Sequence, residues 1–308
     1  MNGANSTRGI RLSLPATSAN LGPGFDAAAV ALDFALQIEA APAPEFSISA
    51  TGRDAGRCAR LQDNLILETY RELLAANRRP VVPLALNIAN AIPLGMGCGS
   101  SAAARLGAIA LAVHFGRLGW DRDRVLEEAA ALEGHPDNVA ACWLGGFVSA
   151  LCEDRSVRVA RVDPPAAWSA IVALPAEPLA TSKARAVLPA TYAMTDVVAN
   201  LQSLGMLGLA FAQARGDLLR IAMSDRIHQP YRAPYCPLLP ALQPLAGRDG
   251  ILGVALSGAG PAVLLVVEAE DRVPGAIASI QSTIQNRLPA ELLACSLSSV
   301  GASQFPEK

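Results

Sequence analysis

The amino-acid sequence predicts an α+β fold with two domains. The chain has 308 residues, which is enough for two domains of ordinary size. Apolar residues make up 52% of it and charged residues 17%, so a substantial core can be buried. The expected order of strands and helices changes after Leu151. We therefore expect one domain over residues 1–155 and a second over residues 156–308.

The first domain is predicted from two strands and several helices. Apolar and polar residues alternate over 32–39 and 82–88, which is typical of half-buried strands. Three further segments predict helices. The first covers 64–77, with Asp63 as its N-cap; the second runs from the Gly/Ser-rich segment near residue 100 to about His114; the third covers 124–133. A short helix at 139–144 is closed by Gly145 and Gly146. The helix at 124–133 must end before Pro136, because the residue preceding a proline is pushed out of the helical region.

The second domain is expected to alternate strands with helices. Its predicted strands cover 157–162, 170–174, 253–256, 263–268 and 292–298; its helices cover two stretches within 194–224 and one at 274–287. A proline-rich connection is expected over 230–244. We expect the methionines and aromatic residues between Met194 and Phe211 to belong to the core.

Composition excludes several function classes. The net charge is −2 and aromatic residues are 5% of the chain, so neither a basic surface for nucleic acid nor a stacking platform for bases is expected. Prolines, glycines and amides interrupt the long uncharged stretches, which argues against a membrane span. The first fifteen residues lack the apolar run of a secretory signal. Six scattered cysteines without a CxxC pair indicate reduced thiols in a cytoplasmic protein.

The segment IPLGMGCGSSAAA, residues 92–104, predicts a phosphate site. Free backbone N–H groups at a helix start carry partial positive charge, and glycines let an anion approach them. The lysine-containing motif GxxxxGK[ST] is absent. Phosphates would therefore be held by backbone amides, by serine hydroxyls and by a metal ion. The candidate residues are Pro93, Gly95, Gly97, Gly99, Ser100, Ser101 and Ala102.

Two other interpretations of this segment stay open. Gly97-x-Gly99-x-x-Ala102, with Asp121 and Asp123 about 20 residues further on, also fits a dinucleotide fingerprint. Pro93 interrupts the expected join between strand and loop, which argues against that alternative. The segment could also be a turn without a ligand.

Two polar clusters lie in the predicted first domain. In LPATSANLGPGFD, residues 14–26, Asn20 and Asp26 flank a turn in which Gly22 and Gly24 are expected to adopt positive φ. In EGHPDN, residues 133–138, two carboxylates, an imidazole and an amide gather at a helix break. A buried core would not have that composition. Glu133 is the candidate there for a divalent metal, which prefers oxygen ligands.

Three clusters in the second domain have plain structural interpretations when taken alone. Residues 257–262, SGAGPA, fit a tight hairpin bend. The segments from Thr181 to Arg185 and from Asp225 to Arg232 fit ordinary surface charge.

In combination, these motifs resemble the landmarks of the GHMP small-molecule kinase superfamily. The four that carry the resemblance are PATSANLGPGFD, IPLGMGCGSSAAA, EGHPDN and LSGAGPA, and their order and spacing match over nearly the whole chain. Within the superfamily, TSKARAVLP and SDRIHQPYR are similar to the homoserine kinase family. The chain departs from the usual pattern at Cys98, where leucine is usual, and over residues 27–30.

The resemblance implies a fold, a reaction and an assembly. The fold would combine an N-terminal domain like the second domain of ribosomal protein S5 with a C-terminal ferredoxin-like domain, with ATP between them. The reaction would transfer the γ-phosphoryl group of MgATP to the side-chain hydroxyl of L-homoserine, giving O-phospho-L-homoserine for threonine biosynthesis. Relatives suggest a homodimer.

A free amino acid brings an ammonium and a carboxylate, and the chain offers partners for both. Asp26 and Asp137, with His135 beside them, are candidates around the ammonium. Arg185 and Arg232 are candidates for the carboxylate, and Asn20 for orienting the hydroxyl.

The remaining roles follow from the resemblance. Ser100 and Glu133 are candidates for Mg²⁺, and Ser257 and Gly258 for the ATP site; Asn64 is a candidate adenine contact. Several relatives carry an aspartate base where this chain has Asn138, so the hydroxyl proton is expected to pass to the phosphate. Arg185 and Asn138 join Asn20 as the candidate catalytic residues.

Three alternatives remain open. The chain could act on another amino acid or alcohol, it could be an ATP-binding sensor without turnover, or it could bind a nicotinamide dinucleotide.

Overall fold

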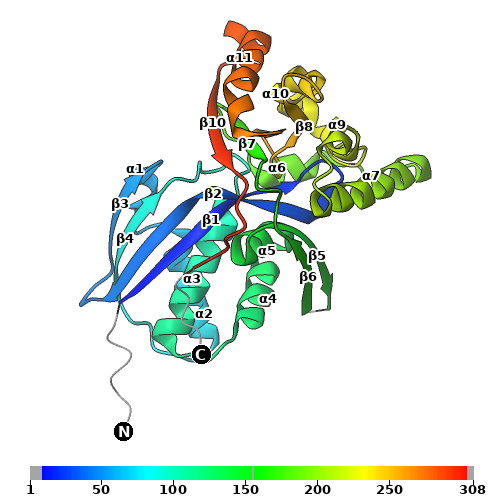
Figure 1. The fold of residues 1–308 in the computed structure, drawn as a ribbon. Coiled ribbons are helices and arrows are strands. Elements are labelled where there is room, and N and C mark those ends of the chain that lie inside the picture. The colour runs from blue at the N-terminus through cyan, green and yellow to red at the C-terminus, as the bar shows by residue number, and fades with distance from the viewer. Residues whose placement is uncertain (1–8, 155, 304–308) are drawn as a thin grey trace.

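The computed structural model describes residues 9–154 and 156–303, which form two sheets with helices packed on them (Figure 1). Most of the N-terminal lead, residues 1–8, lies outside the described residues. None of the helices in these two ranges combines the length and the apolar character needed to cross a membrane.

The first sheet has six strands, with β2 at its centre. Its path is β3-β4-β2-β5-β6, and β1 also pairs with β2. The elements of this half are β1 (Ile10–Asn20), β2 (Gly24–Pro42), β3 (Ser47–Gly52), α1 (Ala55–Cys58), α2 (Leu65–Ala76), β4 (Leu84–Asn90), α3 (Ser100–Gly116), α4 (Arg122–Glu133), α5 (Asp137–Leu144), β5 (Phe147–Glu153) and β6 (Ser156–Val162).

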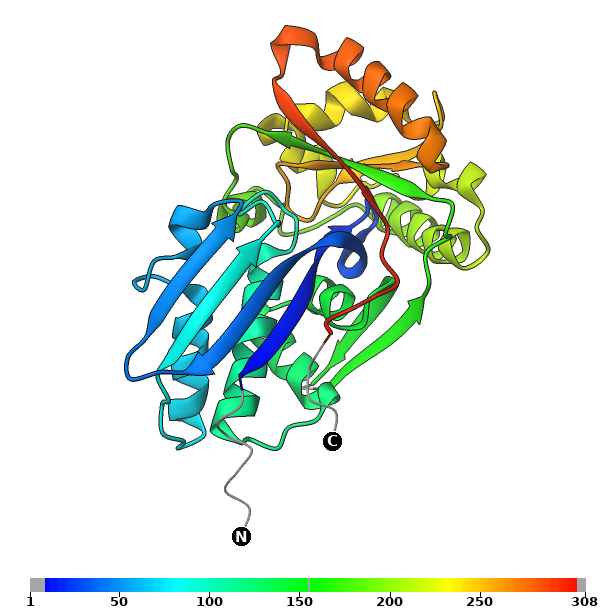
Figure 2. The same cartoon turned by 60° about the vertical axis from the view of Figure 1, so that its left-hand side comes forward.

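Helices α3 and α5 pack against β1 and β2, and α2 and α4 flank them (Figure 2). The alanine-rich sequence of α3 allows close packing, and most of the helix is buried. A Cβ at Gly107 would come within 2.7 Å of Cδ1 of Ile38 on β2. Helix α2 begins one residue later than predicted: Asn64 is its N-cap, and the Asn64 side chain accepts bonds from the N–H groups of Ile66 and Leu67.

The second sheet has four antiparallel strands in the order β10-β7-β9-β8. In chain order this is 4-1-3-2, the arrangement of a ferredoxin-like βαββαβ unit. The elements of this half are β7 (Ser169–Pro175), α6 (Thr181–Ala186), α7 (Met194–Ala212), η1 (Gly216–Leu218), α8 (Leu219–Ala222), α9 (Gln229–Arg232), η2 (Ala233–Tyr235), α10 (Leu238–Leu242), η3 (Gln243–Leu245), β8 (Ile251–Leu256), β9 (Val263–Val267), η4 (Glu270–Arg272), α11 (Val273–Ile284), η5 (Gln285–Arg287) and β10 (Ala290–Ser296).

Two expectations for this half were wrong. The proline-rich stretch 230–244 consists mostly of short helical turns, because proline is tolerated in the first turn of a helix. Met194 and Met206 of α7 are exposed, whereas Phe211 at the other end of the helix is buried as expected.

The change of sheet lies later than the predicted boundary between residues 155 and 156. β6 pairs with β5 over its whole length and so extends the first sheet, and the second sheet begins at Ser169. The chain also returns to the first half after β10 (Figure 2). Leu297 pairs with Leu32 of β2, Ser303 pairs with Ser13 of β1, and Ala302 donates to the carbonyl oxygens at the end of α5.

Candidate active site

The Gly/Ser loop lies between β4 and α3 and is held from two sides. The Thr17 amide on β1 donates to the carbonyl of Cys98 at 3.1 Å, and the Ser257 hydroxyl donates to the carbonyl of Gly97 at 2.8 Å. Gly97 and Gly99 have φ of 86° and 72°, which favours glycine. A Cβ would meet the Ser257 carbonyl oxygen at 2.1 Å from Gly97, and the Thr17 hydroxyl at 2.0 Å from Gly99. The loop therefore tolerates no side chain at these positions, and it ends at the N-terminus of α3.

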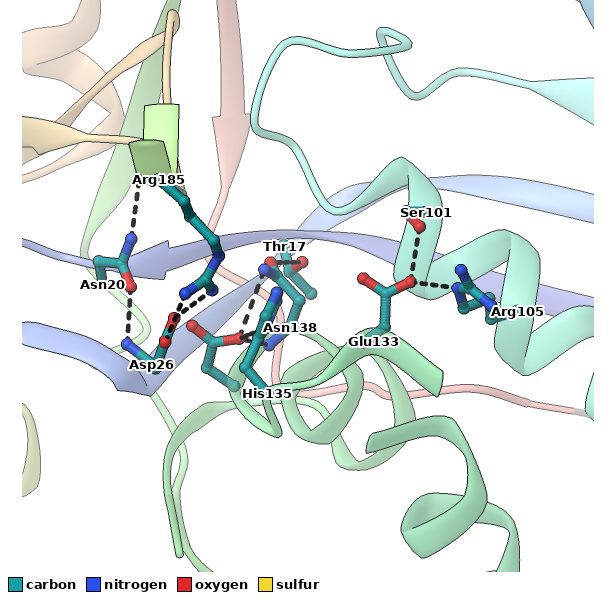
Figure 3. Close-up of polar contacts among 11 residues, drawn as sticks. Thr17, Asn20, Asp26, Ser101, Arg105, Glu133, His135, Asn138 and Arg185 are labelled. Carbon is teal, nitrogen blue, oxygen red and sulfur yellow. Dashed lines mark hydrogen bonds and ion pairs between the residues drawn. The ribbon is translucent and has the colours of Figure 1, made fainter. Parts of the chain in front are cut away.

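Glu133 lies at the end of α4 and faces α3 (Figure 3). Its carboxylate accepts a hydrogen bond from the Ser101 hydroxyl at 2.6 Å and pairs with Nε of Arg105 at 2.7 Å. The side chain of Glu133 is only 10% exposed, so its charge is balanced mainly by Arg105. The serine that meets Glu133 is Ser101, whereas the predicted metal site named Ser100.

Asp137 is the first residue of α5, where the helix dipole favours a negative charge. One of its oxygens, Oδ1, accepts from the Asn138 amide at 2.6 Å and from Nδ1 of His135 at 2.6 Å. Burial disfavours the charged imidazole, but Asp137 outweighs this through the hydrogen bond and its charge, and the pKa of His135 is raised. The Thr17 hydroxyl donates to Oδ1 of Asn138 at 2.7 Å, so the same residue supports the Gly/Ser loop and Asn138.

Asp26 and Arg185 come from opposite halves of the chain and form a two-bond ion pair (Figure 3). Nη1 and Nη2 of Arg185 donate to the two carboxylate oxygens at 2.9 and 2.7 Å. The hydrogen bond with Asp26 raises the pKa of Arg185, against the effect of burial. Asn20 fixes the backbone around Asp26: its amide oxygen accepts from the Asp26 N–H at 3.1 Å, and its amide nitrogen donates to the Gly258 carbonyl at 2.7 Å.

Arg232 is the most deeply buried cation of the site, at 1% exposure. Its Nε donates to the Ala184 carbonyl at 3.0 Å, and Nη1 lies 3.0 Å from Nδ1 of His228. Nε2 of His228 lies 2.8 Å from the Gly22 carbonyl, which can only accept. His228 is therefore neutral, with its proton on Nε2 and Nδ1 as acceptor. Its pKa is lowered, chiefly by burial.

The apolar ring of Phe25 lies beneath the two arginines. The guanidinium carbons of Arg185 and Arg232 lie 5.4 and 5.2 Å from the ring centroid, and the ring stacks on His228 at 5.3 Å. Cations over an aromatic face are attracted by the ring quadrupole. The Phe25 ring therefore helps to hold the two guanidinium groups near each other, although their positive charges repel.

These groups line one cavity of about 420 Å³. All the predicted site residues border it except Asn64, Pro93 and Ser257. Pro93 borders a different cavity, and Ser257 is fully buried beneath Gly97. Phe25, Arg105, Leu132, Leu179 and Ala259 also line the cavity and were not predicted.

A second cavity of about 330 Å³ shares Gly95, Ser100 and Ser101 with the first. It is more apolar, with lining side chains that include Leu36 and Ile88. Asn64 borders it, but the Asn64 amide donates to the carbonyls of Cys58 and Arg60 and accepts two backbone N–H groups. The Asn64 side chain already uses both amide hydrogens and its oxygen in these bonds, so an adenine contact through the side chain would have to replace one of them. The role of Asn64 stays a prediction.

Oxygen donors for a metal ion occur at two places in the cavity. Within the described residues, one set of His, Cys, Asp or Glu side chains brings three ligand atoms within 4.8 Å of one another, and it consists of Asp26, His135 and Asp137. Arg185 already pairs with both oxygens of Asp26, and His135 is a poor ligand for a hard cation. Glu133 and the serines after Gly99 offer only oxygen.

The motif from Leu14 to Asp26 differs from the predicted connection. Residues 10–20 and 24–42 are paired strands, and only the few residues between them form a turn. Gly22 has positive φ as expected, but Gly24 does not. Asn20 and Asp26 take left-handed conformations instead, with φ of 70° and 55°, as polar residues able to bond locally can do.

Two protein-family models match parts of this sequence. The model described as "GHMP kinases N terminal domain" matches residues 64–146, and "GHMP kinases C terminal" matches residues 206–286. A homoserine kinase from Solibacter usitatus is 43% identical over 260 residues, covering 84% of this chain and 85% of the relative. One from a Synechococcus species is 34% identical and covers 97% and 99%. The chain belongs to the homoserine kinase family of GHMP kinases.

The fold of this GHMP kinase agrees with a solved relative. A homoserine kinase structure from Cytophaga hutchinsonii superposes with a TM-score of 0.81 at 23% identity, over 98% of both chains. The predicted fold class, with its two GHMP kinase domains, is confirmed. The dinucleotide interpretation of Gly97, Gly99 and Ala102 is dropped.

Proposed function

We propose that this protein transfers the γ-phosphoryl group of ATP to the side-chain hydroxyl of L-homoserine, giving O-phospho-L-homoserine for threonine biosynthesis. One observation carries the proposal: Asp26, Arg185 and Arg232 line the same cavity as the Gly/Ser loop. This combination fits a substrate that carries an ammonium, a carboxylate and a group able to accept phosphate.

The ion pair between Asp26 and Arg185 is the central element of the amino-acid site. Each side chain is about one-third exposed toward the cavity. A zwitterion would replace one ion pair with two: its ammonium would bind Asp26 and its carboxylate would bind Arg185 and Arg232. Asp137 keeps one carboxylate oxygen for the same ammonium, since its bonds to His135 and Asn138 both end on Oδ1. Mevalonate has no ammonium, so its carboxylate would draw Arg185 away from Asp26 without giving Asp26 a new cation.

The nucleotide would lie along the loop. Its phosphates would meet the backbone N–H groups at the start of α3, where the helix dipole favours anions. The second cavity shares the loop residues and is lined by apolar side chains, which suits an adenine.

Magnesium fits the donors at Glu133. The ion usually binds one or two carboxylates together with substrate phosphates and water, and Glu133 with the hydroxyls of Ser100 and Ser101 supplies such a set. In a kinase the bound ion neutralises charge on the phosphates. Arg105 also pairs with Glu133 at 2.7 Å, so an ion bound at Glu133 would have to displace the Arg105 guanidinium.

None of the described cavity residues is left free to act as a dedicated base. Asp137 holds His135 and would bind the ammonium, and Glu133 pairs with Arg105 and would bind the metal. Asp26 is paired with Arg185, and the raised pKa of His135 favours its protonated form. Asn138 is an amide and cannot take a proton. The hydroxyl proton would therefore pass to the transferred phosphoryl group, while Asn20 orients the hydroxyl.

The protein is proposed to work in the cytoplasm. All six cysteines are free thiols, which suits a reducing compartment. The homodimer remains a prediction.

An ADP-release assay with MgATP and a panel of acceptors tests the function. L-homoserine should give a higher kcat/KM than L-serine, L-threonine or mevalonate. A higher value with another acceptor would assign the chain to a different GHMP activity. ATP binding without turnover on any acceptor would identify a sensor.

A further inference from the structure

Arg105 lies on α3, one helical turn beyond the Gly/Ser loop, and borders the first cavity. Residues four positions apart share a face of a helix, so Arg105 lies on the same face as Ser101. Helical side chains lean toward the helix N-terminus, which directs Arg105 back toward the N–H groups proposed to hold the phosphates. Figure 3 shows that Ser101 and Arg105 both contact Glu133. The guanidinium therefore lies at the phosphate end of the cavity.

The guanidinium of Arg105 keeps its hydrogen-bonding capacity. Its Nε lies 2.7 Å from Oε1 of Glu133, but the N–H is not aligned for a hydrogen bond. In the part of the chain that the structure describes, Nε is one of three buried side-chain atoms without a hydrogen-bond partner. The terminal nitrogens of Arg105 also donate to no residue within 9–154 or 156–303. The ion pair thus holds the charge in place and leaves the donors available to a ligand.

The other cations of the cavity have different partners. Arg185 and Arg232 are assigned to the carboxylate of the amino acid, and His135 pairs with Asp137. Among the described residues that line the cavity there is no lysine. A phosphoryl group in transfer carries negative charge on its outer oxygens, and a planar guanidinium matches phosphate geometry. Arg105 is therefore the cation that remains for the phosphates.

Glu133 positions Arg105 until the nucleotide binds. Their ion pair balances two charged side chains, of which Glu133 is 10% and Arg105 24% exposed. A metal ion bound at Glu133 would displace the guanidinium, and a largely buried cation without a counter-charge is costly. The nucleotide phosphates supply that counter-charge at the same end of the cavity.

We infer that Arg105 is a further catalytic residue, which donates from its terminal nitrogens to the γ-phosphoryl group of ATP. This inference rests on the proposed function. In the transfer, the bond between the γ-phosphorus and the oxygen that bridges it to the β-phosphate breaks, and that oxygen leaves with ADP and the electron pair. The hydroxyl oxygen of the acceptor bonds to the phosphorus, and its proton passes to an oxygen of the transferred group. Arg105 balances the charge on these oxygens during the transfer.

Calorimetric titration of the full chain in the presence of Mg²⁺ tests the inference without an acceptor. The β,γ-imido analogue of ATP carries the γ-phosphoryl group, and ADP lacks it. Arg105→Ala should raise the Kd of the analogue about tenfold or more, because hydrogen bonds between charged groups are lost, and should leave the Kd of ADP within about twofold. Arg105→Lys should fall in between, since lysine keeps the charge but not the planar fork. The matched control is Arg124→Ala, because Arg124 pairs with Glu128 at 2.9 Å outside this cavity; both Kd values should stay at those of the wild type.

The transfer itself supplies the second measurement. The kcat of Arg105→Ala should fall on the order of 100-fold, as for loss of a donor to developing charge, while the KM for homoserine stays within about twofold. Thermal unfolding shows that the variants fold. Equal changes in the two Kd values, or no change in either, would overturn the inference and leave Arg105 as the counter-charge of Glu133. A wild type that binds both nucleotides but phosphorylates no acceptor would refute the proposed function, and the ratio of the two Kd values would still decide whether Arg105 contacts the γ-phosphoryl group.

Discussion

Arg232→Ala should weaken homoserine binding far more than ATP binding. Of the five guanidinium N–H groups, one is given to Ala184 and one to His228, which leaves three for a ligand carboxylate. A hydrogen bond between charged groups contributes about 1.5–3 kcal/mol, and Arg185 remains in place. A loss of about 3 kcal/mol corresponds to a KM for homoserine on the order of 100-fold higher. The KM for ATP should change less than about twofold, because the hydrogen bonds of Arg232 go to Ala184 and His228 and not to the Gly/Ser loop.

Steady-state kinetics with each substrate varied in turn measure the two KM values. Arg232→Lys should fall in between, since lysine keeps the charge but cannot form the two-pronged contact. Arg226→Ala is the matched control: its side chain is 58% exposed and pairs with Asp196 outside the cavity. Thermal unfolding must accompany the assay, because the truncation leaves the Ala184 carbonyl and His228 without a donor. Equal increases in the two KM values, or none, would refute the assigned role.

Three further predictions concern the rest of the cavity. The KM for homoserine should fall as the pH rises above the ordinary value of 6.5, because His135 loses its proton through its raised pKa and with it the positive charge that competes with the substrate ammonium for Asp137. The stability that the protein gains from the pairing of His135 with Asp137 is complete below pH 6.5 and is lost as the pH rises through that raised pKa. His135→Gln should therefore flatten both the KM profile and the stability profile against pH. A flat profile in the wild type would contradict the pairing. Gly97→Ala adds a Cβ 2.1 Å from the Ser257 carbonyl oxygen, so the loop must shift away from Ser257. The KM for ATP should then rise about tenfold or more, which corresponds to a loss of about 1.4 kcal/mol. The control, Gly119→Ala, has the same sign of φ but open space around it, and a similar loss there would point to backbone strain alone. Asn138→Ala should keep kcat near that of the wild type, and stopped-flow measurement of a faster transfer step in Asn138→Asp would show that a protein base can assist.

The sequence predicted the cavity better than the network that supports it. Gly97, Glu133 and Asp137 could be recognised because glycines before a helix and carboxylates at a helix break have few structural uses. His228 could not be recognised in this way. Its partner Gly22 lies 206 positions away in the chain, and only the packing of α9 against the first motif makes its role visible.

The strands of the first motif were missed for a different reason. Residues 16–20 are buried on both faces of β1, so apolar and polar residues do not alternate there. Small side chains at Ala16 and Ala19 resemble a loop composition, although they pack beneath α3 and α5. For helix α7 the error was the opposite one. Met194 and Met206 are apolar residues of the kind expected in a core, but both are exposed to solvent.

The return of residues 297–303 to the first sheet has a mechanical consequence. The polypeptide crosses between the two halves twice, once over residues 163–168 and once after Ser296. The buried core also runs across both halves, since Ala170 and Leu264 of the second sheet belong to the same cluster as the residues of the first sheet. Neither half can therefore be expressed in isolation without severing a strand contact of the other.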